Sequence, residues 1–159
     1  MNHNADQNYI HLLLQTLEKQ EATLQEVLQV TKEQSSIADA PEFQEQLLEK
    51  SLNQKEVLIA KLNELDDGFA AVYGRVRGII REHPTMYRDE LEQMQTYIKR
   101  CTDIGVEIKV LEERNKDKLA QCFAQKHKQY GVRQTAATVA SKYHRTMHPD
   151  IGNTSGFST

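Results

Sequence analysis

Apolar residues recur at alternating intervals of three and four between positions 48 and 79, and again between positions 87 and 122. This spacing keeps one stripe of a helix against a partner, as in a coiled coil. Pro84 lies between the two stripes and disfavours a helix interior, so the sequence predicts a turn at His83-Pro84-Thr85 and an antiparallel pair of helices. The alternative is a single helix with a kink at the proline.

Each stripe is interrupted by two polar positions, Ser51 and Lys55 in the first and Glu112 and Asn115 in the second. When the stripes are paired antiparallel around Pro84, Lys55 lies opposite Glu112 and Ser51 lies opposite Asn115. We therefore expect a buried or half-buried polar layer, which usually specifies register rather than adding stability. The alternative is that Lys55 extends along the edge of the pair and reaches water.

The same register brings apolar positions of the two stripes together. The expected partners are Leu48 with Leu119, Leu58 with Ile108, Leu62 with Gly105, Leu65 with Cys101, Phe69 with Ile98, and Val76 with Leu91.

A further amphipathic helix is predicted over 9–34, after a polar and flexible N-terminal segment over 1–8. Residues 35–40 are expected to connect it to the next helix. Asp39 is a candidate cap for that helix, and Pro41 suits its first turn, where a backbone N–H has no partner in any case.

The helix that carries the first stripe is expected to run to about Glu82 without interruption, although it contains Gly68, Gly74 and Gly78. The stripe passes through these glycines without a change of phase, so we expect one helix with a bend. Gly74 and Gly78 are four residues apart, a spacing that permits close approach of a neighbouring helix. The following helix is predicted from about Thr85 to Tyr130.

Beyond the hinge or cap expected at Gly131, residues 131–148 predict a shorter amphipathic helix, and residues 149–159 have a composition typical of disorder. This helix either folds back on the bundle, frays, or recognises a partner by laying its apolar face in a groove. The fold expected for the whole chain is all-α: an elongated antiparallel helical bundle or coiled coil of three long helices over 9–130, plus this shorter C-terminal helix. The apolar stripe of the C-terminal helix consists of Val132, Ala136, Val139, Ala140, Tyr143 and Met147.

Charge is distributed unevenly along the chain. Residues 1–50 contain nine acidic and three basic side chains, whereas residues 118–149 contain six basic and no acidic ones. The two regions can neutralise each other across the bundle. Nucleic-acid binding is not expected, because the basic region carries few aromatic side chains among its bases.

No catalytic motif and no cofactor-binding motif is found, so we expect a binding protein rather than an enzyme. His144 and His148 have the spacing of a helical metal pair, but a stable site needs three or four ligands, so no metal is expected. Cys101 and Cys122 are too far apart on one helix for a disulfide, which is consistent with a reducing cytosol. No signal peptide or membrane span is expected either.

Three pieces of the chain resemble the FlgN-type flagellar export chaperones, in the form seen in Gram-positive bacteria. The first is Lys55-x-x-Leu58-Ile59-x-x-Leu62-x-x-Leu65-Asp66-x-Gly68-Phe69, the second is Glu112-x-x-Asn115-Lys116, and the third is Ala140-x-x-Tyr143-x-x-x-Met147. The resemblance extends over about residues 9–147 and includes the plan of a small acidic helical protein with a looser C-terminal segment.

The resemblance implies a cytoplasmic chaperone that binds hook–filament junction (hook-associated) proteins and delivers them to the flagellar type III export apparatus. It also implies a monomer or weak dimer. Client binding would fall on the C-terminal stripe: Val132, Ala136, Val139, Ala140, Tyr143 and Met147. The basic character of that segment departs from the family and suggests an acidic client terminus. Two alternatives are a filament-cap chaperone of the same secretion system and a structural coiled-coil adaptor.

Overall fold

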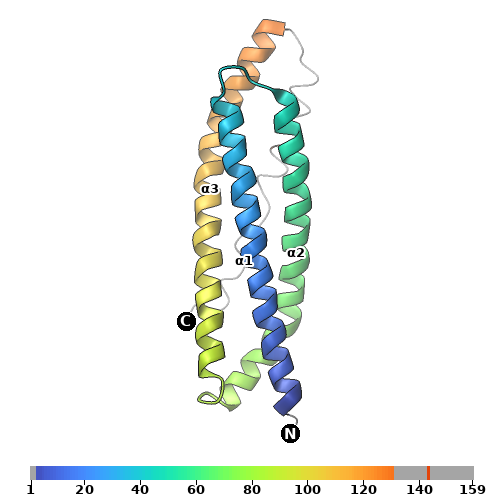
Figure 1. Cartoon of the computed structure of the whole chain (residues 1–159), viewed down its shortest axis with the longest axis vertical. Coiled ribbons are helices and arrows are strands. Elements are labelled where there is room, and N and C mark those ends of the chain that lie inside the picture. Colours follow the sequence, from blue (N-terminus) through green and yellow to red (C-terminus); the bar gives the residue numbers. More distant parts are fainter. Residues whose placement is uncertain (1–2, 131–142, 144–159) are drawn as a thin grey trace.

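The computed structural model describes residues 3–130 together with Tyr143, and in these residues every regular element is an α-helix. Helix α1 spans His3–Asp39, α2 spans Glu45–Glu82 and α3 spans Arg88–Tyr130 (Figure 1). The predicted all-α class is therefore confirmed. The helix predicted over 131–148 and the tail over 149–159 lie outside the described residues, Tyr143 excepted.

Helix α1 is longer than predicted at both ends. It begins at His3, so most of the N-terminal segment predicted to be flexible is helical. It also continues through 35–39, where a connection was expected, because Ile37 and Ala38 extend its apolar face onto the core. Asp39 consequently ends α1 instead of capping α2, and its carboxylate lies 2.9 Å from Lys118 Nζ on α3.

The connection to α2 comprises residues 40–44, so Pro41 does not lie in the first turn of α2 as predicted. Gln44 is the residue that precedes the helix. Its backbone is extended, and its side chain makes no capping hydrogen bond to the first turn.

Helix α2 is continuous through Gly68, as predicted, and it ends where the proline requires. The His83 N–H donates to the carbonyl of Ile79 at 3.0 Å and closes the last turn. Residues 84–87 form the turn, so α3 starts at Arg88, three residues later than predicted. Because α3 returns antiparallel to α2, the single kinked helix is excluded (Figure 1).

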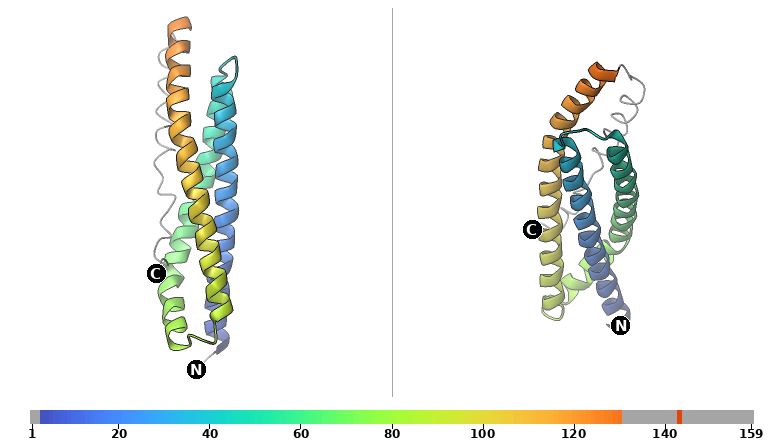
Figure 2. Two further views of the ribbon diagram at one scale, coloured as in Figure 1. Left: turned by 90° about the vertical axis from the view of Figure 1, so that its left-hand side faces the viewer. Right: turned by 45° about the horizontal axis from the view of Figure 1, so that its top comes forward.

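The three helices lie side by side, and α1 occupies the position between the other two, antiparallel to α2 and parallel to α3 (Figures 1 and 2). Helix α1 packs against both α2 and α3, whereas the backbones of α2 and α3 approach each other at almost no point. The close α2–α3 pair expected from the two stripes is therefore wrong in one respect. Their stripes meet across a core to which α1 contributes a third face.

Buried side chains form three clusters along the bundle, and all three helices contribute to the first two. Three of the expected pairs share a cluster, Phe69 with Ile98, Leu58 with Ile108 and Leu48 with Leu119, which agrees with the expected register. The foot cluster consists of Ile10, Leu13, Leu17, Phe69, Val76, Ile79, Tyr87, Met94 and Ile98. The middle cluster consists of Leu24, Val27, Leu28, Leu62, Cys101, Ile104 and Ile108, with Leu58 at its edge. The head cluster consists of Leu48, Leu52, Leu119 and Tyr143, with Ile37, Ala38, Phe43 and Phe123 packed against it.

The glycines of α2 do not serve close helix approach, contrary to the prediction for Gly74 and Gly78. A Cβ atom added to Gly68, Gly74 or Gly78 would meet no heavy atom within 4 Å. All three positions face away from the core, so their glycines only weaken the helix.

Replacing Gly74 with alanine should therefore raise the free energy of unfolding by about 1 kcal/mol, because alanine loses less backbone entropy in a helix. Gly78→Ala should act alike and additively. Urea denaturation followed by circular dichroism measures the change. The reverse substitution at an exposed alanine of the same helix, Ala71→Gly, is the matched control and should cost a similar amount. A destabilised Gly74→Ala would show that the end of α2 requires glycine.

Cys101 supplies a second test of the core, because burial raises the pKa of its thiol to about 12, with Glu21 and Asp66 adding to the effect. The folded state then keeps the thiol proton while the unfolded state loses it above the ordinary value of 9.0. The free energy of unfolding should fall by about 1.4 kcal/mol between pH 8 and pH 10 from this group. Cys101→Ala should lose that part of the pH dependence, measured by urea denaturation at both pH values, and an unchanged slope would contradict the burial of the thiol.

Candidate functional site

A layer of polar side chains separates the middle cluster from the head cluster. At its centre Lys55 Nζ lies 2.6 Å from Glu112 Oε1, an ion pair between α2 and α3. The exposed fraction is 1% for Lys55 and 3% for Glu112. The pair expected from the register is thus present, and Lys55 does not reach water at the edge of the bundle.

Helix α1 contributes Gln34, a residue that the sequence analysis did not single out. The Gln34 Oε1 atom accepts a hydrogen bond from Lys55 Nζ at 3.2 Å, and its Nε2 donates to Ser51 Oγ at 3.2 Å. Ser51 Oγ in turn donates to the carbonyl of Leu48 at 2.6 Å. The sequence nevertheless indicates that Gln34 faces the core, because Gln34 continues the apolar stripe of α1 from Val27 and Thr31 at helical spacing.

Asn115, like Ser51 and Lys55, is hydrogen-bonded to α1. Asn115 Nδ2 donates to the carbonyl of Thr31 at 3.0 Å, and the Ser35 hydroxyl donates to Asn115 Oδ1 at 2.6 Å. Ser51 and Asn115 both lie buried in one layer, and each accepts a hydrogen bond from a side chain of α1. We define the polar layer by these members: Thr31, Gln34, Ser35, Ser51, Lys55, Glu112 and Asn115.

Burial sets the electrostatics of this layer. It lowers the pKa of Lys55, against the opposing attraction and hydrogen bond of Glu112. The ammonium group is surrounded by Glu112 and Gln34 instead of water, and these two partners replace part of its lost hydration. A lysine held in this way is a structural group, with no route to a substrate in solution.

Tyr143 is the one residue of the expected client-binding stripe that the structure describes, and it is buried. Its exposed fraction is 3%, and its ring belongs to the head cluster with Leu48, Leu52 and Leu119. Its hydroxyl donates to the carbonyl of Glu112 at 3.2 Å. The other predicted client-binding positions lie outside the described residues: Val132, Ala136, Val139, Ala140 and Met147.

The surroundings of the Tyr143 hydroxyl are acidic. Its pKa is raised chiefly by burial and further by the nearby carboxylates of Glu112 and Glu113. We call the place where the ring lies the Tyr143 site and define it by Leu48, Leu52, Leu119 and the Glu112 carbonyl. The site therefore has apolar walls, a backbone carbonyl that accepts a hydrogen bond, and carboxylates close by.

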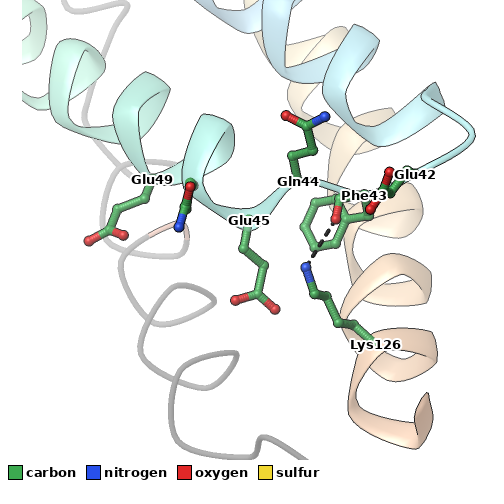
Figure 3. A pocket seen from close by; sticks show the side chains of 7 residues that line it. Glu42, Phe43, Gln44, Glu45, Glu49 and Lys126 are labelled. Carbon is green, nitrogen blue, oxygen red and sulfur yellow. Dashed lines mark hydrogen bonds between the residues drawn. The ribbon is translucent and has the colours of Figure 1, made fainter. Parts of the chain in front are cut away.

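A surface hollow lies near the head cluster, where the α1–α2 connection meets the end of α3 (Figure 3). Lys126 Nζ donates to the carbonyl of Phe43 at 3.1 Å and lies 5.7 Å from the centre of its ring. Phe43 also makes an edge-to-face contact with Phe123, so the connection is attached to α3. Three carboxylates line the hollow beside this single lysine: Glu42, Glu45 and Glu49.

Among residues 3–130 and Tyr143, no three His, Cys, Asp or Glu side chains come together as metal ligands would, and no helix has the length and apolarity needed to cross a membrane. The pair His144 and His148 lies outside this part of the chain.

Compared with known proteins, the chain matches no protein-family model, no curated protein and no solved structure.

The ion pair gives a direct test of the layer. Lys55→Leu should lower the free energy of unfolding by about 3–5 kcal/mol, because it leaves the Glu112 carboxylate buried without its cation. Combining it with Glu112→Leu should restore most of the loss, since both desolvation costs then disappear. Lys61→Leu, at an exposed lysine of the same helix, is the control and should change little. Urea denaturation measures all four proteins, and a double variant no more stable than Lys55→Leu would contradict the pairing.

Proposed function

We propose that the chain is a cytoplasmic export chaperone of the FlgN type. In this proposal it binds hook–filament junction proteins, keeps them unassembled and delivers them to the flagellar type III export apparatus. The observation that carries the proposal is the burial of Tyr143 in the head cluster, at an exposed fraction of 3%. A side chain from beyond α3 has entered the bundle, which is the kind of contact by which a helical groove receives an amphipathic segment.

The contacts of Lys55 and Glu112 support a binding role in preference to catalysis. These are the most deeply buried ionic groups among the described residues, and they lie 2.6 Å apart. General acid–base or nucleophilic chemistry needs a group that can touch a substrate, and this pair is closed off by three helices. We infer that the chain works through its apolar surfaces and without a cofactor.

The residues that carry the resemblance to the FlgN type also have physical roles in the structure. Lys55, Glu112 and Asn115 are members of the polar layer, and Leu58, Leu62 and Phe69 belong to or pack on the clusters. The resemblance thus concerns positions that specify the bundle. This supports a shared architecture, including the shorter helix proposed over 131–148, with Tyr143 as its contact to the head cluster.

The proposed clients present apolar stripes on helical termini, which self-associate when left exposed. In this proposal the C-terminal stripe covers such a surface, using Val132, Ala136, Val139, Ala140, Tyr143 and Met147. The chaperone would act as a monomer or weak dimer and bind one client chain, because a stable oligomer would occupy the same kind of surface.

A structural coiled-coil adaptor is the second candidate, and one observation favours it. Val106 and Val110 lie one turn apart on α3 with exposed fractions of 57% and 46%. Two neighbouring exposed valines form a small apolar strip on which a second chain can pack. An adaptor would therefore be a stable oligomer that Val106→Lys disrupts.

Size-exclusion chromatography with light scattering tests the function. The full chain is mixed separately with the host's hook–filament junction proteins and with its filament-cap protein. The proposal predicts a 1:1 complex with a junction protein and none with the cap protein. Val139→Asp, on the stripe, should remove the complex by placing a charge on the apolar contact, whereas Thr138→Asp, one residue away and off the stripe, should retain it.

The other possible results of this chromatography experiment support one of the two alternative functions. A complex with the cap protein alone makes the chain a filament-cap chaperone. A stable oligomer that binds neither protein and dissociates in Val106→Lys makes it an adaptor, and the export role is then overturned.

A further inference from the structure

Tyr143 belongs to the expected client-binding stripe, yet its side chain is not available to a client in this structure. The ring is buried in one cluster with Leu48 and Leu52 of α2 and Leu119 of α3, and all three leucines are at most 1% exposed. A client that binds the bundle here must compete with this ring. The Tyr143 site is therefore an acceptor that the chain itself already fills.

The chemistry of the site indicates what else can fill it. Its walls are leucine side chains, so it takes a large apolar or aromatic group. The Glu112 carbonyl accepts a hydrogen bond from the Tyr143 hydroxyl at 3.2 Å, which adds a preference for a ring that carries a donor. This carbonyl lies inside α3 and keeps its helical hydrogen bond in any case, so an occupant with a donor gains a second bond to it.

The charges near the site restrict further which side chain can occupy it. Glu113 is exposed, and its carboxylate, together with that of Glu112, helps to raise the pKa of the Tyr143 hydroxyl. In the sequence Tyr143 stands directly between Lys142 and His144, with Arg145 following. The chain's own occupant is thus an aromatic residue with bases next to it in the sequence, and its hydroxyl lies near two carboxylates. A competitor for the same site is favoured by the same pattern.

We propose that a client helix enters the Tyr143 site in exchange for Tyr143, and that this helix presents an aromatic or large aliphatic side chain flanked by basic residues. This deepens the proposed function, rests on it for the identity of the client, and changes one part of it: Tyr143 competes with the client at the head cluster, while the other stripe positions remain the proposed client contacts. It also changes the charge expected at this point of the client, which would be basic beside the side chain that replaces Tyr143, whereas the sequence suggested an acidic client terminus.

Exchange has a quantitative consequence. When an acceptor is occupied for most of the time by its own chain, the apparent dissociation constant for a competitor rises by the inverse of the free fraction. A buried aromatic ring holds such a site strongly enough to raise that constant roughly tenfold. Removing the ring should therefore tighten client binding by about the same factor.

A probe that needs no client tests the acceptor first. A fluorescein-labelled synthetic peptide of residues 131–148 is titrated with the full chain, and its anisotropy is followed. Tyr143→Ala should bind this peptide roughly tenfold more tightly than the unchanged chain does, since its site is vacant. Tyr143→Phe, which keeps the ring, should stay near the unchanged chain. Circular dichroism confirms that each variant is folded.

Two controls locate the binding. A peptide in which Tyr143 itself is alanine should lose the gain, because it has no ring to insert. In the Tyr143→Ala chain, Glu113→Gln should weaken peptide binding about twofold to fivefold, as expected for an exposed charge. Glu92→Gln, at an exposed position near the start of α3 and far from the site, should leave peptide binding unchanged. Equal peptide affinities for the unchanged and Tyr143→Ala chains would overturn the proposal.

The same two chains are then compared with the junction protein that co-elutes. Tighter binding by Tyr143→Ala supports exchange, whereas weaker or unchanged binding shows that Tyr143 contacts the client directly or is irrelevant, and overturns it. If no junction protein binds either chain while the peptide result holds, the export function fails and the acceptor remains. The two failures are thus distinguishable.

Discussion

The arrangement of this bundle depends on one constraint, the need to give Lys55 and Glu112 a partner once both are buried. Each charge costs several kcal/mol to remove from water, so any packing that separates them is strongly disfavoured. Apolar stripes alone do not discriminate in this way, because a slip of one heptad between α2 and α3 again pairs apolar positions. The same slip would place Gly105 or Leu119 opposite Lys55 and leave the ammonium group without its carboxylate. The polar layer therefore selects a single register, and the 2.6 Å separation shows that this register is reached.

Helix α1 turns this two-helix constraint into a three-helix one. Gln34 binds Lys55 and Ser51 through its two amide ends, while Ser35 and the Thr31 carbonyl bind Asn115. Helix α1 is hydrogen-bonded to both α2 and α3. If α1 slid or rotated, buried polar groups on both of these helices would lose their partners. The same contacts explain why α1 lies between the other helices, since its buried polar side chains bind α2 through Gln34 and α3 through Ser35. The bundle is thereby aligned along its whole length from a layer near one end.

The register was predictable because two polar interruptions in each stripe coincide when the turn falls at Pro84. The contribution of α1 was not, because a glutamine and two serines after an apolar stripe are typical of a helix that is ending. Gln34 is buried and Ser35 half-buried against Lys55 and Asn115, which lie far away in the sequence, whereas Ser36 stays exposed. The spacing of Gly74 and Gly78 also permitted a contact that is absent, since spacing does not state which face of a helix meets a neighbour. For the candidate site, the sequence identified Tyr143 as part of a stripe, but docked and free stripes have identical spacing.

The position of the Tyr143 site follows from the same constraint. Glu112 contributes its carboxylate to the ion pair and its carbonyl to the Tyr143 hydroxyl, so one residue belongs to both. Leu48 is linked to the layer as well, through the hydrogen bond from Ser51 to its carbonyl. The walls of the site are therefore held in register by groups that an occupant does not touch. The Tyr143 hydroxyl binds the carbonyl of Glu112, whereas Lys55 binds its carboxylate, so an exchange at the site does not require the ion pair to break. An acceptor with this property can exchange one apolar side chain for another without loosening the bundle that forms it.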